Sequence, residues 1–211
     1  MNTFTGALLC GGRSSRMGRD KALIEIDGRP LWHIQLTKLQ AVCGEVIVCG
    51  SRSQQALFQT ESVPFAPDAT ADLGPLSGMA RALESTQRSH VLVLAVDMPK
   101  MSERYLQGLC DAAQKHCGVV PERAGRLESL CAVYPVDLLP WVISLLSGND
   151  RSLRSLIRIA LQKRLMRPFP VPDSDLELFE NWNAPADISP LGPRSPSTAS
   201  PSPFPIHLPP S

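Results

Sequence analysis

Leu8-Leu-Cys-Gly-Gly-Arg-Ser-Ser-Arg-Met-Gly-Arg-Asp-Lys21 is the stretch of sequence that decides the fold. It overlaps the end of a short apolar run, Phe4–Leu9, and it combines three glycines with four cations that fall within nine residues. These are Gly11, Gly12, Gly18, Arg13, Arg16, Arg19 and Lys21. A glycine-rich loop that leaves a buried strand lets backbone N–H groups approach an anion closely, and nearby cations neutralise its charge. The stretch therefore predicts a buried strand followed by a phosphate-binding loop.

The rest of the chain alternates between apolar runs typical of strands and runs with the apolar spacing of helices. Strands are predicted over 4–10, 46–49, 63–66, 90–96, 118–121, 127–134 and 164–169, with a short extended piece over 22–26. Helices are predicted over 30–42, 54–59, 75–86, 102–116, 135–146 and 152–161. This alternation predicts a single three-layer, Rossmann-like α/β domain with a mostly parallel sheet.

Ligands of such sheets bind beyond the carboxyl ends of the strands. The glycine-rich stretch follows the first predicted strand, and Ser51, Asp68 and Asp97 follow the next three strands of the chain. We therefore expect all four to line one cleft.

Size and composition narrow the class of protein. The chain has 211 residues, a formal net charge of +1 and a hydrophobic fraction of 43%. This size suits one sizeable domain. A nearly neutral chain has no global field that attracts nucleic acid, so we expect no nucleic-acid partner. The six cysteines form neither a CxxC pair nor a zinc-ligand spacing, so we expect free thiols.

The two ends of the chain carry further expectations. Residues 1–3 are not the start of a basic, then apolar leader, and no apolar run approaches the ~20 residues of a membrane span. We therefore expect a cytoplasmic protein that does not contact membranes. Residues 190–211 consist mostly of proline and serine and cannot bury enough apolar surface to offset their ordering entropy. They are predicted to form a disordered tail, which leaves residues 1–189 as the folded domain.

The glycine-rich stretch does not match the two most familiar phosphate-binding motifs. A P-loop needs GxxxxGK followed by Ser or Thr, but Gly12 and Gly18 are separated by five residues and Arg19 follows Gly18. The dinucleotide fingerprint GxGxxG fails because Gly11 and Gly12 are adjacent. A tight turn with solvated arginines is the structural alternative, and the density of cations favours phosphate binding over it.

The stretch Leu9–Lys21 resembles the signature LAGGxSxRMGxDK of cytoplasmic nucleotidyltransferases. Its double glycine is most similar to that of the molybdenum cofactor guanylyltransferases of the MobA type. Further similar segments follow in order at Leu23–Leu31, Leu73–Met79, Leu94–Pro99 and Asn181–Pro185. The resemblance covers about residues 4–189, which it identifies as a nucleotidyltransferase domain of the nucleotide-diphospho-sugar transferase type. It implies an enzyme that transfers GMP from GTP to molybdenum-molybdopterin and releases pyrophosphate.

Nucleotidyl transfer needs charge neutralisation and positioning more than it needs a strong base, because the attacking phosphate oxygen is already an anion. The expected catalytic residues are Arg16, Lys21 and Asp97. Arg16 and Lys21 would bind the triphosphate as a planar fork and a point charge. Asp97 ends an apolar strand, where a carboxylate is costly unless it meets a cation. Asp97 is suited to bind Mg²⁺, the cofactor that the resemblance implies, while the ion bridges phosphate oxygens. The alternative is that Asp97 caps a helix.

The resemblance also implies the residues that contact the nucleotide and the second substrate. Asp68 would contact the base or the ribose, while Ser51 stands where guanylyl members carry asparagine, which leaves that contact open. Two asparagines would lie on the pterin or phosphate side of the cleft, or would simply be turn residues before Pro185. The implied nucleotide-binding residues are Leu9, Cys10, Gly11, Gly12, Lys21, Ser51, Asp68 and Asp97, and the implied pterin-side residues are Asn181 and Asn183.

Three other functions are left open by the sequence. One is CTP-dependent transfer to molybdopterin, and another is transfer to a sugar phosphate. The third is a non-catalytic carrier of the molybdenum cofactor, which would need no residues that clamp a metal and a triphosphate. The implied partners are GTP and molybdenum-molybdopterin, together with apo-proteins of molybdoenzymes or other proteins of cofactor biosynthesis.

Overall fold

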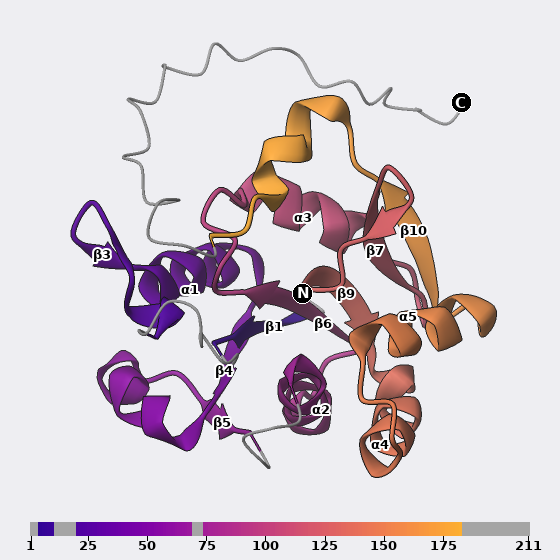
Figure 1. The fold of residues 1–211 in the computed structure, drawn as a ribbon, viewed down its shortest axis with the longest axis horizontal. Helices are drawn as coiled ribbons and strands as arrows, with labels where there is room; N and C mark the ends of the chain where they lie inside the picture. The colour runs from indigo at the N-terminus through magenta and orange to yellow at the C-terminus, as the bar shows by residue number, and fades with distance from the viewer. Residues whose placement is uncertain (1–3, 11–19, 69–73, 183–211) are drawn as a thin grey trace, which may run out of the picture.

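The computed structural model describes residues 4–10, 20–68 and 74–182, which form one central sheet covered by helices on both faces (Figure 1). The strand order is β10 (Met166–Pro170), β7 (Gly118–Arg123), β9 (Cys131–Pro135), β6 (His90–Ala95), β1 (Phe4–Leu9), β4 (Glu45–Gly50) and β5 (Phe65–Pro67). The short strand β8 (Arg126–Leu127) pairs with β7. β9 runs antiparallel to β6 and β7, whereas β1, β4, β5 and β6 pair in parallel. The predicted α/β fold with a mostly parallel sheet is confirmed.

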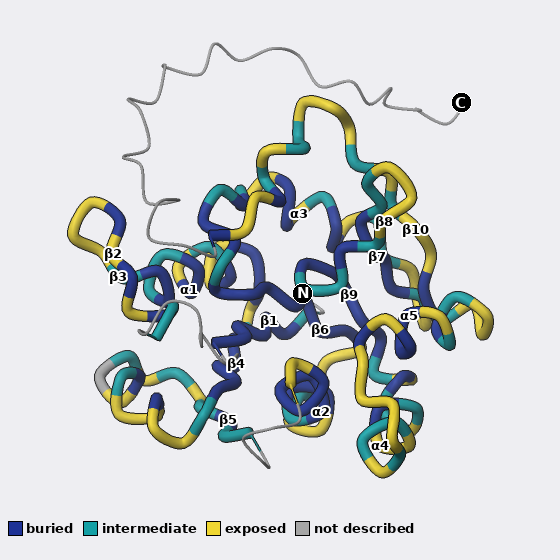
Figure 2. The backbone as a smooth tube through the Cα atoms, viewed as in Figure 1, coloured by how far each residue is buried: buried dark blue, intermediate teal, exposed yellow. Residues whose placement is uncertain are grey.

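The helices form two layers. α1 (Leu31–Val42) and α3 (Glu103–Ala112) lie on one face of the sheet, and α2 (Pro75–Ser85), α4 (Leu139–Ser147) and α5 (Leu153–Gln162) lie on the other (Figure 1). The central strands are buried on both faces, as Figure 2 shows, which explains why they appear in the sequence as nearly continuous apolar runs.

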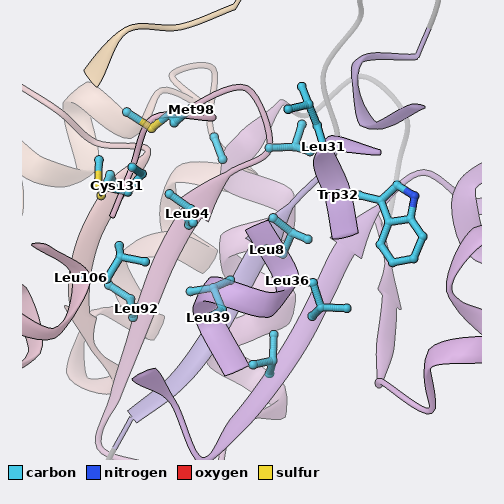
Figure 3. Packing of buried hydrophobic residues seen from close by; sticks show 14 of the residues in the cluster. Leu8, Leu31, Trp32, Leu36, Leu39, Leu92, Leu94, Met98, Leu106 and Cys131 are labelled. Atoms are coloured by element: carbon cyan, nitrogen blue, oxygen red, sulfur yellow. Dashed lines mark hydrogen bonds between the residues drawn. The ribbon is translucent and has the colours of Figure 1, made fainter. Parts of the chain in front are cut away.

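Successive side chains of β1 point to opposite faces and enter two separate apolar clusters. Leu8 packs with the cluster of α1 and α3, where Leu36 and Leu39 gather around it (Figure 3). Ala7 and Leu9 pack with the cluster of α2, α4 and α5. The strand before the glycine-rich stretch is therefore fixed from both sides of the sheet.

The predicted extended piece over 22–26 is wrong in its first part. Asp20 accepts a hydrogen bond at 3.0 Å from the N–H of Ala22 and so caps a turn of 3-10 helix. Asp27 and Gly28 then adopt positive φ angles of 51° and 73°, which suit a tight hairpin turn. The elements are η1 (Lys21–Leu23), β2 (Glu25–Ile26) and β3 (Arg29–Pro30). Lys21 consequently stands on a capped turn.

Three predicted helices differ in type or length from the observed ones. The helix over 54–59 is a longer 3-10 helix, η2 (Arg52–Glu61). The helix predicted to reach residue 116 ends at Ala112, because Ala113 is already extended, and Gln114 and Cys117 then form a β-bridge. The helix predicted from residue 135 begins as the 3-10 helix η3 (Val136–Leu138) before α4.

The segment after β10, residues 171–182, crosses back over α3 toward the end of β6 (Figure 1), and we call it the C-terminal strap. It includes the 3-10 helix η4 (Asp173–Phe179), which the sequence did not predict. Phe179 is buried against Tyr105, with ring centroids 5.3 Å apart. The backbone N–H of Trp182 donates to the carbonyl oxygen of Asp97 at 2.9 Å. The strap thereby brings Asn181 to the end of β6.

Two further expectations concern the chain as a whole. All six cysteines are free thiols, as the sequence predicted. Among the described residues, no helix combines the length and the apolar character that crossing a membrane requires. The predicted tail, residues 190–211, lies outside the described residues.

Candidate active site

The carboxyl ends of β1, β4, β5 and β6 meet at one edge of the sheet, and backbone hydrogen bonds join the residues that follow them. The N–H of Cys10 donates to the carbonyl oxygen of Cys49 at 2.8 Å, and the N–H of Val96 donates to that of Leu9 at 3.1 Å. The N–H of Asp68 donates to the carbonyl oxygen of Gly50 at 2.8 Å. Cys10, Ser51, Asp68 and Asp97 therefore follow neighbouring strands, as the sequence led us to expect.

Lys21 and Asp97, which are 76 positions apart in the chain, form an ion pair at this edge. Lys21 Nζ lies 3.0 Å from Asp97 Oδ2, and the two side chains are only 21% and 18% exposed. Asp97 Oδ1 is buried and has no hydrogen-bond partner among the described residues. A buried carboxylate oxygen without a donor is unfavourable on its own and becomes favourable when a cation reaches it.

Asp68 stands beside the first turns of α2. An added Cβ at Gly78 would lie 3.1 Å from Leu9 Cδ2, 3.2 Å from Cys49 Cβ and 3.6 Å from Asp68 Oδ1, so this helix approaches the strand ends closely because residue 78 has no side chain. Burial raises the pKa of the Asp68 carboxyl above its usual value by desolvation of the charged form. Burial likewise raises the pKa of the Cys10 thiol well above its usual value, so Cys10 is a neutral packing group near pH 7.

A cleft of about 750 Å³ is lined by Met98, the residue that follows Asp97, and does not include Asp97 itself. Its cations are Arg126, which is 73% exposed and lies in the β7–β8 hairpin, and Arg154, which is exposed in the first turn of α5. Its buried carboxylate, Glu128, is held 2.9 Å from Arg123. The cleft is lined by Met98, Gly125, Arg126, Leu127, Glu128, Ser129, Leu130, Ser152, Arg154, Ile157 and Asn181.

Asn181, one of the two asparagines that the sequence led us to expect on the pterin or phosphate side, lies within the described residues and lines this cleft. The sequence did not point to Arg126 or Arg154, because each lies in a segment with no local motif. Arg126 follows a hairpin turn at Ala124-Gly125, and Arg154 follows the helix-capping Ser152. The two arginines become candidates only in the folded structure, where the β7–β8 hairpin and α5 line the same cleft.

The other expected site residues fall into two groups. Leu9 is buried on the α2 side of the sheet, and Ser51 hydrogen-bonds through its N–H and its hydroxyl group to Gln54 Oε1, at 2.9 and 3.2 Å. The remaining four lie outside the described residues: Gly11, Gly12, Arg16 and Asn183. Within the described ranges, no group of three or more His, Cys, Asp or Glu side chains is placed to hold a metal ion.

Comparisons with known proteins agree on a family. The model of the MobA-like NTP transferase domain matches residues 6–165. A protein of Xanthomonas euvesicatoria named "Molybdenum cofactor guanylyltransferase" is 33% identical over 192 residues, which cover 89% of this chain and 94% of that protein. A protein of Opitutus terrae named "Probable molybdenum cofactor guanylyltransferase" is 32% identical, and the match covers 88% of this chain and 93% of that protein.

Solved structures show the same fold at lower identity. A nucleotidyl transferase from Methanothermobacter superposes with a TM-score of 0.73 and 18% identity, covering 89% of this chain and 94% of that one. Molybdopterin-guanine dinucleotide biosynthesis protein A from Archaeoglobus fulgidus superposes with a TM-score of 0.68 and 22% identity, covering 87% of this chain and 94% of that one. The family model, the relatives and the fold agree, and the chain belongs to the family of MobA-like NTP transferase domains.

Proposed function

We propose that this protein transfers GMP from GTP to molybdenum-molybdopterin, producing molybdopterin guanine dinucleotide and pyrophosphate. The observation that carries the proposal is the Lys21–Asp97 pair at the carboxyl edge of the sheet. The pair stands in a chain whose relatives are named molybdenum cofactor guanylyltransferases. A non-catalytic carrier of the cofactor would not need a lysine and an aspartate paired at this edge of the sheet.

The reaction joins a phosphate oxygen of the acceptor to the α-phosphorus of GTP. The bond between the α-phosphorus and the oxygen that bridges it to the β-phosphorus breaks, and its electron pair leaves with pyrophosphate. Lys21 would neutralise the triphosphate as a point charge, and Arg16 would bind it as a planar fork. The backbone amides of residues 11–15 would complete the phosphate site.

Mg²⁺ is the metal that we propose for this site. Asp97 Oδ1 is a hard oxygen ligand, buried and without a donor among the described residues, so its chemistry fits the ion. One carboxylate is enough in principle, because Mg²⁺ is commonly held by one or two carboxylates together with substrate phosphates. When bound, the ion supplies positive charge to the phosphate oxygens. Lys21 Nζ lies 3.0 Å from Asp97 Oδ2, so the other carboxylate oxygen would be the one available to the ion.

The nucleotide base would lie over the ends of β1 and β5. Leu9, Cys10, Gly11 and Gly12 would line the purine, and Asp68 would accept hydrogen bonds from the base or the ribose. Guanine presents two donor groups on one edge, which suits a carboxylate acceptor. The close approach of Gly78 to Leu9 and Asp68 supports a site of fixed shape at this point.

The acceptor would occupy the cleft that Met98, the residue after Asp97, helps to line. Its volume of about 750 Å³ falls within the range of roughly 300–1,000 Å³ that is usual for small-molecule sites. Arg126 and Arg154 offer positive charge to an anionic acceptor, and Asn181 and Asn183 would contact it from the C-terminal side. We further propose that the protein acts in the cytoplasm and passes its product to apo-proteins of molybdoenzymes or to other proteins of cofactor biosynthesis.

Nucleotide selectivity tests the proposal. In thermal unfolding with Mg²⁺ present, we expect GTP to stabilise the protein more than CTP or ATP does. A ligand at 100 times its Kd adds about 2.7 kcal/mol to the free energy of unfolding, which is a readily measured shift. Stronger stabilisation by CTP would contradict guanylyl transfer and favour cytidylyl transfer, and stabilisation by none of the three nucleotides would contradict GMP transfer.

A further inference from the structure

Gln54 makes hydrogen bonds to the residues on both sides of the glycine-rich stretch. This side chain is only 5% exposed and lies near the start of η2. Its Nε2 donates to the carbonyl oxygen of Cys10 at 3.2 Å and to Asp20 Oδ2 at 2.7 Å. Cys10 and Asp20 directly precede and follow residues 11–19. One buried amide nitrogen therefore joins the backbone of Cys10 to the side chain of Asp20, ten positions further along the chain.

The oxygen of the same amide fixes its orientation. Gln54 Oε1 accepts hydrogen bonds from the N–H of Ser51 at 2.9 Å and from the Ser51 hydroxyl at 3.2 Å. A rotated amide would place its nitrogen against the Ser51 N–H and its oxygen against the Asp20 carboxylate, and both contacts would be repulsive. Two donors and two acceptor positions are all that a glutamine amide offers, so its hydrogen-bonding capacity is used in full.

The hydrogen bonds lead from Gln54 to Lys21. The second oxygen of Asp20 caps the turn that begins at Lys21, through the N–H of Ala22 at 3.0 Å. Lys21 Nζ in turn lies 3.0 Å from Asp97 Oδ2. The contacts thus connect the end of β4 with the cation that we assign to the triphosphate.

The backbone at the end of β4 leaves room for this amide. An added Cβ at Gly50 would lie 2.5 Å from Gln54 Oε1, a separation that real Cβ atoms do not show. A side chain at residue 50 would therefore displace the Gln54 amide from this position.

We propose that Gln54 is a positioning residue for nucleotide binding, which acts by clasping Cys10 and Asp20 and so fixing both flanks of the glycine-rich stretch. Gln54 acts through these residues, and we assign it no contact with the nucleotide. The inference rests on the proposed function, because the stretch that it positions is the one assigned to the phosphates. Loss of the clasp is expected to weaken nucleotide binding more than it weakens the fold.

The Gln54→Glu variant separates the effect of Gln54 on nucleotide binding from its effect on the fold. Glutamate keeps the oxygen that accepts from the Ser51 N–H, and Ser-x-x-Glu is itself a favourable helix-start pattern, so the start of η2 is retained. The substitution removes both donors and places a carboxylate against the carboxylate of Asp20. We expect the Kd for GTP with Mg²⁺, measured by calorimetry without acceptor, to rise about tenfold or more, the loss expected for a charge-assisted hydrogen bond.

Two companion variants make the result specific. Adding Asp20→Asn to Gln54→Glu exchanges donor and acceptor, because the new amide at position 20 can donate to the new carboxylate at position 54. We expect this double variant to recover much of the GTP affinity. Gln107→Glu is the matched control, because Gln107 Nε2 also donates to a carboxylate, Asp111 Oδ1, at 2.8 Å on the exposed side of α3. We expect the Gln107→Glu variant to bind GTP as tightly as wild type does.

The outcomes separate the inference from the proposed function. A GTP Kd within about twofold of wild type in both Gln54→Glu and Gln54→Leu would overturn the clasp, whatever happens to the melting temperature. If wild type binds CTP in place of GTP, the guanylyl assignment fails, and a loss of CTP affinity in Gln54→Glu still supports the clasp. Wild type that binds no nucleotide would overturn both.

Discussion

Replacing Asp97 by alanine is expected to lower kcat/KM for nucleotidyl transfer by at least about 10³-fold, which corresponds to ~4 kcal/mol of transition-state stabilisation. Asp97 Oδ1 is the buried oxygen that we assign to Mg²⁺, and Oδ2 holds Lys21. The variant loses the metal ligand and the partner that orients the lysine. Initial rates of pyrophosphate release at GTP and acceptor concentrations below their KM values, followed across a Mg²⁺ titration, measure the effect on kcat/KM.

The fold is expected to survive this substitution. Lys21 keeps access to water in the absence of its partner, because its side chain is 21% exposed. Asp97→Asn keeps the shape of the side chain and removes only the charge, so it serves as a second variant that excludes a packing effect. Asp111→Asn, on the exposed side of α3, removes a carboxylate away from the site and should leave the rate unchanged. Full activity of Asp97→Ala would refute the metal assignment.

Lys21→Ala is expected to raise the Kd for GTP by about 10- to 100-fold, the range that follows from the loss of one charge-assisted contact with phosphate. The Lys21 ammonium lies 3.0 Å from Asp97 and on the turn that Asp20 caps, so its position is fixed before nucleotide binds. Calorimetric titration with GTP and Mg²⁺ measures the change directly, without dependence on turnover.

Lys115 provides the matched control for Lys21. It is an exposed lysine between α3 and β7, so Lys115→Ala removes the same charge from the chain outside the proposed site. Its GTP affinity should equal that of wild type. Equal affinities for Lys21→Ala and Lys115→Ala would contradict the assignment of Lys21 to the triphosphate.

Much of the fold could be predicted because the decisive signals are local. The strands β1 and β6 are continuous apolar runs that both faces of the sheet bury, and Pro75 starts α2 where a proline is favourable. The direction of β9 could not be predicted, since an apolar run does not reveal which strands it will pair with. The predicted strand 127–134 is wrong in its first part, because residues 128–130 separate β8 from β9.

The prediction of the site was limited by contacts between distant segments. Lys21 and Asp97 were each identified from neighbouring residues, but their ion pair joins positions 76 residues apart. Gln54 completes a Ser-x-x-Gln capping box at the start of η2, but that local motif does not reveal its contacts with Cys10 and Asp20, which lie 44 and 34 residues away in the chain. η4 was missed because its stability comes from the packing of Phe179 against Tyr105 in α3.

The most direct test is to identify the product that the purified protein forms from molybdenum-molybdopterin in the presence of Mg²⁺ and equal concentrations of GTP and CTP. We predict that the guanine dinucleotide accumulates in equal amounts with pyrophosphate and that Asp97→Ala forms neither product. Accumulation of the cytosine dinucleotide instead, or of no dinucleotide with wild-type protein, would contradict GMP transfer at the Lys21–Asp97 site.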